Sequence, residues 1–449
     1  MPTPPDKTHE TGDPEEHIRR LVQEFEKRLR QEIPASGETL PQTLDEIEQV
    51  ADRLGQEIKE QIQKELLERT GSGYVGKLTA CSCRRMARFV ATYKKQVLTR
   101  CGQATLWRAY YHCGACNKGF CPLDARLGLG GGQCSASVRA LVSRFASFLP
   151  YRLAAQEMEA ICGIAVSAST LRREAQAVGR ALEQDWSERE HQVRANRAKV
   201  PPHRPASLHL SMDGVLIHVG GEWREVKCAV AYETGKDEKG YAQGVERARY
   251  YATLARSSAF GPRVRTLAFL AGSGRCSRVG VVADGSEWIW QEVGKQFAKS
   301  VQILDFYHAS EHLWEVARAR FGADSEAGKT WMQEQQEQLL SDKVEQVIGA
   351  VEAWKPARQE DWDLRGREVG YLGSHAHRML YGSLRAGGWH IGSGVMEAAC
   401  KAVVQGRLKG VGMRWSEKGA EAMLHLRSAW CSSEHPDFAD VARRSIRPS

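Results

Sequence analysis

The spacing of apolar residues predicts two helices at the start of the chain. One is expected from about Glu15 and one from about Asp45, because apolar side chains recur every three or four positions in both segments. The two apolar stripes consist of Ile18, Leu21, Val22, Phe25 and Leu29, and of Ile47, Val50, Leu54, Ile58, Ile62 and Leu66. Such helices suit a hairpin packed on the body of the protein or pairing with a second subunit, and the pattern favours neither. Residues 1–13, rich in Pro, Thr, Asp and Gly, are expected to be disordered.

From residue 74 to residue 200 the pattern passes from β-prone pairs back to helix. A β-hairpin is expected over Gln96–Tyr111, turning near Arg100–Gly102. Ala136–Arg197 is predicted to be helical, and Pro201 and Pro202 mark a boundary after it.

The second half of the chain combines strands with helices. Two alternating runs that turn at Gly220 and Gly221 predict a β-hairpin. Apolar runs further on predict two short strands, each leading into a helix. The predicted segments are the hairpin Leu208–Tyr232, the strands Val279–Ala283 and Val301–Leu304, a polar helical stretch over 313–386, and a basic helical stretch over Gly392–Trp430.

Together these patterns predict a multidomain α/β protein. Its expected parts are an N-terminal helical region over 1–73, a cysteine-rich β-hairpin module over 74–135, a helical region over 136–200, the first part of an α/β core over 201–312, a helical stretch over 313–388, and a helical, basic C-terminal part over 389–449.

Composition and charge narrow the classes of partner. Charged residues make up 26% of the 449 residues and apolar ones 42%, which is ordinary for a folded globular protein. Lys and Arg exceed Asp and Glu by 63 − 55 = 8, and the sequence pI is near 8.8. This balance permits a nucleic-acid partner without requiring one. Basic residues gather in Arg84–Arg108 and Lys401–Lys418, as contacts to phosphates would need.

The expected location is the cytoplasm. No stretch approaches the roughly 20 apolar residues of a membrane helix, and the polar start lacks the apolar centre of a signal peptide. Twelve cysteines in that compartment indicate metal ligation or ordinary burial rather than disulfides.

Two short-spaced cysteine pairs predict a structural zinc site. One residue separates Cys81 from Cys83, and two separate Cys113 from Cys116, which suits tetrahedral zinc held by four thiolates. The hairpin between the pairs would bring them together, and Cys121 is an alternative ligand. A redox Cys-x-x-Cys is the minor alternative, because no thioredoxin-like strand and helix surround it.

Two helical patterns on either side of Cys162–Ile164 suggest a helix-turn-helix. The side chains expected to face its core are Leu153, Met158 and Ile161 from the first helix, and Val166, Leu171 and Ala175 from the second. The second helix presents Arg172, Arg173 and Gln176 near its start, where contacts to bases and phosphates are made. An ordinary pair of packed helices joined at a glycine gives a similar pattern and remains the alternative.

Three carboxylates are notable for their positions. Asp213 lies within an apolar strand, Asp284 follows the strand that ends at Ala283, and Glu397 lies in a helix start with Ser393 as its cap. Singly, each has an ordinary explanation in turn or helix-start chemistry. Together they can converge on two divalent cations such as Mg²⁺ or Mn²⁺, which activate a water or a 3′ hydroxyl towards a phosphodiester. Without metal, such acids repel one another and raise at least one pKa.

Asp305 and His308 form a further candidate pair at the end of the strand Val301–Leu304. Their spacing of three places them on neighbouring positions at a helix start. His308 would contact a phosphate or assist proton transfer. A helix N-cap at Asp305 with a packed His308 is an equal alternative.

The order of these pieces resembles the bacterial insertion-sequence transposases of the DDE class, and is most similar to the ISKra group of the Mutator-like superfamily. The Asp-x-x-His motif between the second Asp and the Glu is the most specific shared feature. The resemblance runs from Cys81 to Trp430 and leaves out the N-terminal helices. Its pieces are the two cysteine pairs, Met212–Gly214, Val282–Trp290, Leu304–Ala309, Gly392–Glu397 and Met413–Ser416.

The resemblance implies a ribonuclease-H-like core interrupted by a helical insertion. Asp213 would lie on the first strand, Asp284 after the fourth and Glu397 on a late helix, as a metal-binding catalytic triad. Asp305 is close enough in sequence to compete with Asp284 as the second acid, but the Asp-x-x-His motif accounts for it separately. The basic residues that would hold DNA phosphates near Glu397 are Lys401, Arg407, Lys409 and Arg414.

The function implied is a DNA transposase. It would bind the terminal inverted repeats of its element, cut there and join the ends to target DNA, as a homodimer or larger assembly that pairs two ends. A DNA-binding regulator derived from a transposase, with an idle core, is the alternative, against which three converging acids argue. A structure-specific nuclease would explain the acids but not a separate helix-turn-helix.

Overall fold

The computed structural model describes residues 14–32, 43–129 and 132–444. The disorder expected for residues 1–13 concerns residues outside these ranges. The chain divides into two compact units, and the division passes through three helices. The first unit comprises Met1–Val142, Ala154–Glu174 and Phe438–Ser449, and the second comprises Ser143–Leu153 and Ala175–Asp437.

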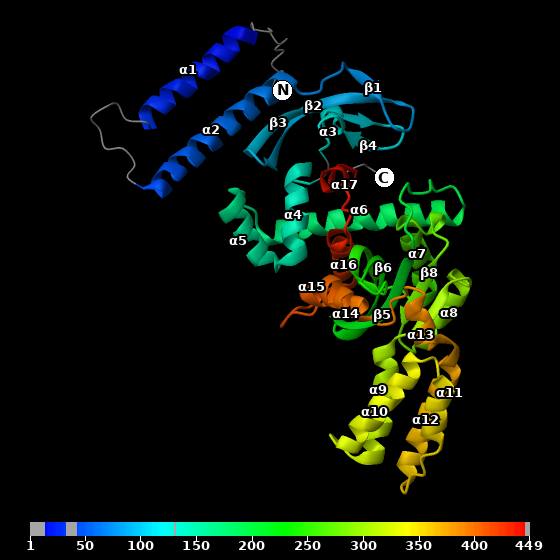
Figure 1. Cartoon of the computed structure of the whole chain (residues 1–449). Coiled ribbons are helices and arrows are strands. Elements are labelled where there is room, and N and C mark those ends of the chain that lie inside the picture. The colour runs from blue at the N-terminus through cyan, green and yellow to red at the C-terminus, as the bar shows by residue number, and fades with distance from the viewer. Residues whose placement is uncertain (1–13, 33–42, 130–131, 445–449) are drawn as a thin grey trace. The chain divides into compact units, whose positions relative to one another are not determined.

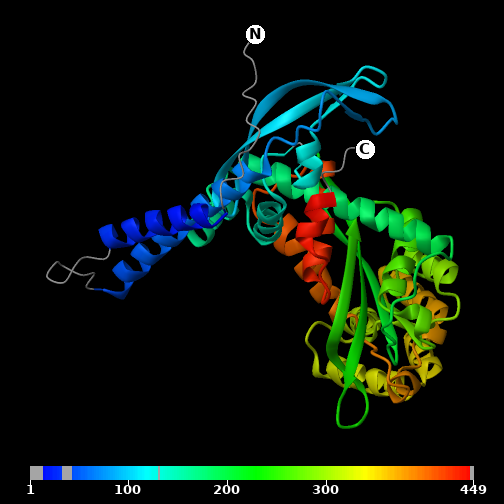
Figure 2. The ribbon, with the colours of Figure 1, turned by 90° about the horizontal axis from the view of Figure 1, so that it is seen from above.

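The first unit begins with the two expected helices, α1 (Pro14–Glu32) and α2 (Leu44–Thr70), which lie side by side in Figures 1 and 2. The side chain and backbone of Thr43 form a capping box with Glu46, which fixes the start of α2. Leu54 is the buried member of the α2 stripe. Other members of the stripes are exposed, namely Val22, Ile47, Ile62 and Leu66.

A four-stranded antiparallel sheet follows in the same unit, with the order β1-β2-β3-β4. Its strands are β1 (Leu78–Ala80), β2 (Met86–Thr99), β3 (Gly102–Cys113) and β4 (Lys118–Phe120), and the short helix α3 (Pro122–Arg126) comes next. The expected hairpin is therefore confirmed, and it is longer than predicted at both ends. Its turn ends at Gly102, whose φ of 95° suits glycine.

The helical region over 136–200 contains α4 (Ala136–Phe148), α5 (Tyr151–Cys162) and α6 (Ala168–Arg194). The chain leaves α5 through Gly163, at a φ of 64°. Met158, Leu171 and Ala175 are buried as expected, but Ile161 is 69% exposed and Leu153 39%. The expectation that these two face the core is wrong, because the buried face of α5 centres on Ala154 and Met158.

The second unit is built on a five-stranded sheet with the order β7-β6-β5-β8-β9. The strands are β5 (Leu208–Val219), β6 (Glu222–Lys236), β7 (Ala242–Thr253), β8 (Val279–Ala283) and β9 (Val301–Leu304). β5, β6 and β7 pair antiparallel, whereas β8 and β9 run parallel to β5. The protein is thus a mixed α/β protein with two sheets, as the fold class predicted in its coarse form.

One strand of this sheet, β7, was not expected. The outer half of β7 is exposed, and only its last three residues form a continuous buried run. A strand that carries polar side chains on both faces gives no alternation to detect. The remaining four strands have buried apolar runs and match the predicted segments closely.

The helices of the second unit pack on the sheet and on one another around one continuous apolar core. They are α7 (Ser257–Leu270), α8 (Glu287–Gln296), α9 (Phe306–Phe321), α10 (Glu326–Leu340), α11 (Val344–Glu352), α12 (Gln359–His375) and α13 (Tyr381–Ala386), with single 3₁₀ turns at Ser273–Arg275 and Ala376–Arg378. The predicted helical stretch over 313–386 corresponds to α9–α13, seen in yellow and orange in Figure 1. Its Leu339 and Leu372 belong to the same buried cluster as Leu208 and Val281 of the sheet.

The C-terminal part is helical, with a break in the middle. It contains α14 (Gly394–Ala399), a π-helical segment η3 (Cys400–Gln405), α15 (Gly406–Leu408), α16 (Glu417–Cys431) and α17 (Phe438–Arg444). Residues 409–416 lie outside the helices, so the expected helix from Gly392 to Trp430 is interrupted there. The carbonyl of Trp415 accepts a hydrogen bond of 2.9 Å from the amide of Gly220, which fixes this connection to the β5–β6 turn.

Within the described ranges, no helix combines the length and apolarity that crossing a membrane requires.

Candidate functional site

The first two acids of the expected triad lie on neighbouring parallel strands. β5 and β8 pair with Leu208 opposite Val279 and Leu210 opposite Val281. Continuing this register brings Asp213 level with Asp284, immediately after the end of β8. Side chains at the same level of adjacent strands point to the same face, and the strands are about 4.8 Å apart. The two carboxylates therefore share one side of the sheet.

The same register also extends to Asp305, at the end of β9. β8 pairs with β9 with Ala283 opposite Leu304, which places Asp284 level with Asp305. Asp213, Asp284 and Asp305 thus form a row of aspartates at the ends of parallel pairing. We call these three residues the aspartate row.

The local contacts of Asp213 leave it partly desolvated and close to another acid. Its Oδ1 accepts a hydrogen bond of 2.6 Å from the amide of Gly214, and the thiol of Cys400 lies 3.8 Å from Oδ2. Burial raises the pKa of Asp213, and the charge of Asp284 raises that pKa further. A divalent cation bound here would offset the cost of holding this carboxylate ionised.

Asp284 is oriented by the turn that follows β8. The amide and hydroxyl of Ser286 donate hydrogen bonds to its Oδ1 and Oδ2, at 2.9 and 3.0 Å. The indole of Trp290 donates to its backbone carbonyl at 2.8 Å. Each carboxylate oxygen keeps free lone pairs, because one hydrogen bond leaves acceptor capacity unused. The side chain is therefore held in place and can still ligate an ion.

Asp305 has a different environment, in which it serves as the N-cap of α9. It is buried and caps α9, since its Oδ1 accepts a hydrogen bond of 2.8 Å from the amide of Tyr307. Its Oδ2 accepts a hydrogen bond from the hydroxyl of Ser393. The amide of Phe306 also donates to the carbonyl of Ile391 at 2.9 Å. The start of α9 thus holds the segment that leads to Glu397.

The expectation that the side chain of Ser393 caps the helix of Glu397 is wrong. Ser393 occupies the N-cap position of α14 but makes no side-chain capping hydrogen bond. Its hydroxyl is committed to Asp305 instead, so this serine joins two helix starts.

Replacing Asp305 by alanine is expected to destabilise the protein more than the loss of a helix cap alone. The cap accounts for about 1 kcal/mol, and the half-buried hydroxyl of Ser393 loses its charged acceptor, at a further cost of about 1 kcal/mol. Chemical denaturation of Asp305→Ala and Ser325→Ala measures the difference, because Ser325 caps α10 through its hydroxyl. Equal losses in the two variants would show that the contact with Ser393 contributes nothing.

Glu397 does not lie with the other two acids in this structure. It sits on α14, which packs against β5 and β6, but its side chain is 68% exposed. Its Oε1 accepts a hydrogen bond of 2.5 Å from Lys401, and this contact lowers the pKa of Glu397. Among the described residues, the carboxylate oxygens of Asp213, Asp284 and Glu397 do not all lie within 4.8 Å of one another. The structure brings Asp213 and Asp284 together and leaves Glu397 paired with Lys401.

His308 and an unexpected tyrosine lie beside this site. The ring of His308 is 4.9 Å from that of His312 and 6.2 Å from that of Tyr371, on α12. A Cβ added to Gly285 would clash with the Tyr371 ring, so this ring lies against the residue after Asp284. Its buried hydroxyl has no hydrogen-bond partner among the described residues. Burial raises the pKa of Tyr371, and the charge of Asp284 raises it further.

Tyr371 was not predicted as a site residue. It lies more than eighty positions after Asp284, within a polar helical segment that carries no motif. Only the packing of α12 against α9 and α11 brings its ring to Gly285, beside Asp284.

The four expected cysteines converge in the first unit and could hold a metal such as zinc. The sulfur atoms of Cys81, Cys83, Cys113 and Cys116 all lie within 4.8 Å of one another. The Cys81 and Cys116 sulfurs are 3.6 Å apart, and those of Cys83 and Cys113 are 3.7 Å apart. Cys121 lies outside this group, so the alternative ligand is not needed.

The turns that carry the cysteines favour thiolates. Arg84 follows the first pair at a φ of 66° and Asn117 follows the second at 54°, so each turn directs backbone N–H groups back to the sulfurs. The N–H of Cys83 lowers the pKa of the Cys81 thiol to about 6, and the N–H of Cys116 lowers that of Cys113. The N–H of Lys118 acts in the same direction on Cys116, but burial and the three neighbouring thiols raise the pKa of Cys116, which a bound cation would reverse. Thiolates are the form that ligates zinc, so the donor set and its surroundings fit the ion.

The helix-turn-helix candidate presents two of its three expected contact residues. Arg172 and Arg173 are exposed near the start of α6. Gln176 is half-buried, with its amide nitrogen close to Gly419, at the start of α16. Next to Arg173, Glu174 pairs with Arg139 of α4 at 2.8 Å, and both side chains are almost fully buried. This buried ion pair fixes the start of α6 within the first unit.

Arg172 supplies a test of this surface. In the described residues it makes no ion pair, so Arg172→Ala should leave stability unchanged. If α6 contacts DNA phosphates, the variant should lower DNA affinity and reduce the slope of log K against log salt concentration by about 1. Arg180→Ala, an exposed arginine two turns further along α6, is the matched control. Identical salt slopes for wild type and Arg172→Ala would exclude the contact.

The basic residues near Glu397 separate into exposed and buried ones. Lys401, Lys409 and Arg414 are exposed. Arg407 is 2% exposed, and its Nε donates a hydrogen bond of 2.7 Å to the carbonyl of Ala146. Its guanidinium also lies over the rings of Tyr151 and Trp415. The expected role of Arg407 as a phosphate contact is therefore wrong, because its charge is enclosed by packing inside the second unit.

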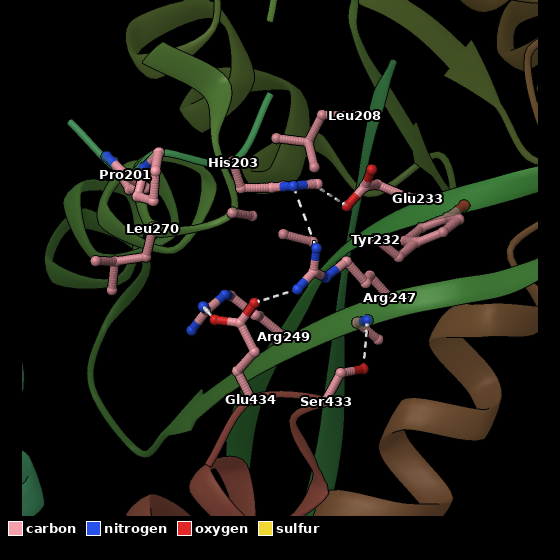
Figure 3. Close-up of a pocket in the computed structure, with 14 residues that line it drawn as sticks. Pro201, His203, Leu208, Tyr232, Glu233, Arg247, Arg249, Leu270, Ser433 and Glu434 are labelled. Atoms are coloured by element: carbon pink, nitrogen blue, oxygen red, sulfur yellow. Dashed lines mark hydrogen bonds and ion pairs between the residues drawn. The ribbon is translucent and has the colours of Figure 1, made fainter. Parts of the chain in front are cut away.

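A cavity of about 320 Å³ lies at the start of β5, at Leu208 (Figure 3). Charged side chains line it, but they neutralise one another. Glu434 pairs with both Arg247 and Arg249, and His203 is 2.7 Å from Glu233. This cavity is separate from the aspartate row and presents no convergent set of unpaired groups.

Comparison with known proteins places the chain in a family. The chain belongs to the family described as Uncharacterised protein family (UPF0236), whose profile matches residues 42–437. The match includes the cysteine cluster, the aspartate row and Glu397. A search of curated protein sequences gave no match to the chain.

Proposed function

We propose that this protein is a DDE-type DNA transposase that binds the terminal inverted repeats of its element, cleaves the DNA there and transfers the ends to target DNA. The observation that carries this proposal is the placement of Asp213 and Asp284 at the same level of two neighbouring parallel strands. Two carboxylates so placed supply the hard oxygen ligands that Mg²⁺ or Mn²⁺ prefers.

The sheet of the second unit supports a ribonuclease-H-like core. Three antiparallel strands, β5 to β7, are followed along the chain by β8 and β9, which join the sheet on the other side of β5. The resemblance of the sequence to DDE transposases places the first acid on the first strand and the second after the fourth. Asp213 lies on β5, the first strand of this sheet, and Asp284 follows β8, its fourth.

In the proposed site, Asp213 and Asp284 are the ligands already in place, and Glu397 is the third. In the structure Glu397 is paired with Lys401. When DNA binds, Glu397 would separate from Lys401 and move to the aspartate row. The bound ions would supply activation of a water or a 3′ hydroxyl and stabilisation of the leaving oxygen. Tyr371, whose ring lies against Gly285, and His308, whose ring is 6.2 Å from that of Tyr371, would contact the phosphate or move a proton.

The remaining elements suit the handling of DNA. A structural zinc in the cysteine cluster would hold the β2–β3 hairpin, and Arg172, Arg173, Lys409 and Arg414 would contact phosphates. Pairing two DNA ends requires a homodimer or larger assembly, for which the exposed apolar side chains of α1 and α2 are a candidate surface. Such an enzyme would act on DNA in the bacterial cytoplasm, at the nucleoid.

The proposal is tested by cleavage of labelled DNA that carries the inverted repeats flanking the coding sequence. Wild-type protein is expected to nick these ends in Mg²⁺ or Mn²⁺, and to leave a scrambled sequence of the same length uncut. Binding without cleavage under either ion would refute the proposed enzyme.

A second candidate is a DNA-binding regulator derived from a transposase. The observation that favours it is the exposed Glu397–Lys401 ion pair, which leaves the triad open. Under this alternative the protein binds the ends, and substitutions in the aspartate row change neither binding nor any downstream effect.

A further inference from the structure

Two carboxylates and one imidazole meet in the second unit, away from the aspartate row and the cysteine cluster. Glu183 comes from α6, and Glu421 and His425 come from α16. One ligand atom of each side chain lies within 4.8 Å of one of each of the others. Glu421 and His425 are four residues apart, so they lie on the same face of α16. Neither residue belongs to a motif noted in the sequence.

The close approach of the two helices explains why Glu183 reaches this point. A Cβ added to Gly179 would collide with the backbone carbonyl of Ala422, so α6 and α16 touch at this glycine. Glu183 lies one turn beyond Gly179 and therefore faces α16. Figure 1 shows α16 lying against α6. The glycine thus sets the distance at which the three ligands converge.

His425 is the observation that points to a ligand. Its side chain is 3% exposed, and its Nε2 is buried with no hydrogen-bond partner among the described residues. Nε2 lies 3.4 Å from Oε1 of Glu421, without the geometry of a hydrogen bond. A buried imidazole nitrogen that makes no hydrogen bond is costly. The imidazole nitrogen lies near two carboxylates, and a neutral imidazole nitrogen is a common ligand of metal ions.

Glu421 is held in position by groups behind it. The hydroxyl of Thr253, at the end of β7, donates a hydrogen bond to its Oε1. The amide of Leu254 donates one of 2.9 Å to its Oε2. Hydrogen bonds of this kind orient the carboxylates that ligate metals. Glu183, in contrast, has no hydrogen-bond or ion-pair partner among the described residues that would compete with an ion, and it would complete the set.

The charges around the cluster leave it with an excess of negative charge. Arg263 is the neighbouring cation, and it is already engaged by Glu190 at 3.4 Å and by the hydroxyl of Tyr251. Glu190 also pairs with Arg194 at 3.6 Å, so Arg263 is the cation left to Glu183 and Glu421. The Tyr251 ring covers His425 at 5.7 Å and limits access of water. A bound divalent cation would balance these carboxylates.

We infer that Glu183, Glu421 and His425 form a site for a divalent transition-metal ion, with zinc as its best-suited occupant. One imidazole and two carboxylates match the nitrogen and oxygen ligands of zinc sites with three protein ligands. The ion joins α6 to α16 and, through Glu421, to the end of β7. The ion would stabilise the position of α16, which follows the segment that carries Glu397. This inference does not rest on the proposed function.

Zinc content per chain, measured by mass spectrometry after equilibration with buffered free zinc, tests the site. Wild-type protein is expected to hold two zinc ions, one in the cysteine cluster and one here. Glu183→Gln should hold one, because it removes a ligand charge and disturbs no other contact of the described residues. Glu188→Gln, an exposed glutamate on the same helix, should hold two. His425→Gln should also hold one.

Further variants separate the sites and the two proposals. Cys113→Ser should hold one zinc, and the double variant Cys113→Ser with Glu183→Gln none, while circular dichroism confirms that each chain is folded. Asp213→Asn should still hold two zinc ions, because neither of them is assigned to the aspartate row. A wild-type content of one zinc, or equal contents in Glu183→Gln and wild type, overturns the inference and leaves the transposase proposal unaffected.

Discussion

Replacing Asp213 or Asp284 by asparagine is expected to lower the rate of DNA strand cleavage on the order of 10³-fold, while binding of the DNA ends persists. The size of the effect follows from the proposed site, in which each carboxylate would position an ion at the reacting phosphate and so stabilise charge in the transition state. Asparagine retains the acceptor that Gly214 and Ser286 contact, so the local fold should survive. Single-turnover cleavage and a binding assay on the same labelled ends separate the two effects.

The control for these variants is Glu287→Gln. Glu287 is exposed in the first turn of α8, three residues after Asp284, and its side chain accepts a hydrogen bond of 2.8 Å from Gln291. It should cut at the wild-type rate. Cleavage by Asp213→Asn or Asp284→Asn within a few-fold of wild type would show that the aspartate row does not hold the catalytic ions.

Replacing Cys113 by serine is expected to unfold the cysteine-rich end of the β2–β3 hairpin. Metal binding by four thiolates in small structural sites contributes on the order of 10 kcal/mol to folding, and Cys113 is fully buried in the small apolar cluster around the site. The variant should lose one bound zinc and the protection of the Tyr111 and Cys113 amides against hydrogen exchange. The amides of the second unit should keep their protection, because that unit has its own core.

Cys101→Ser is the matched control for the zinc site. Cys101 lies in the same hairpin but at its turn, away from the cluster. It should retain the metal and the exchange protection of wild type. Unchanged zinc content in Cys113→Ser would contradict the assignment of the four cysteines as one site.

Local patterns predicted the second sheet well where its strands are buried. β8 and β9 are short apolar runs, and both were predicted with the bounds that the structure shows. The β5–β6 turn was marked by Gly220 and Gly221, which adopt φ values of 66° and 98°. β7 was missed because it has no apolar pattern of its own. It forms a strand by pairing with β6.

The site was predicted in part, and the missing part depends on tertiary packing. The sequence identified Asp213 as an acid within an apolar strand and Asp284 as an acid that follows a strand, but only the pairing register shows that they are level. Arg407 was expected at the surface because it lies in a basic segment, yet the rings of Tyr151 and Trp415 enclose it. Tyr371 and the cluster of Glu183, Glu421 and His425 have no local signal, since each forms only when distant helices pack.

Joining of DNA ends to a target tests the central claim most directly. The substrate is a labelled duplex that carries one terminal repeat with an exposed 3′ hydroxyl, incubated with a supercoiled plasmid and Mg²⁺. We expect wild-type protein to join the label covalently to the plasmid, and Asp213→Asn to bind the duplex without joining it. Wild-type protein that binds the duplex but forms no joined product in Mg²⁺ or Mn²⁺ would contradict the assignment as a transposase.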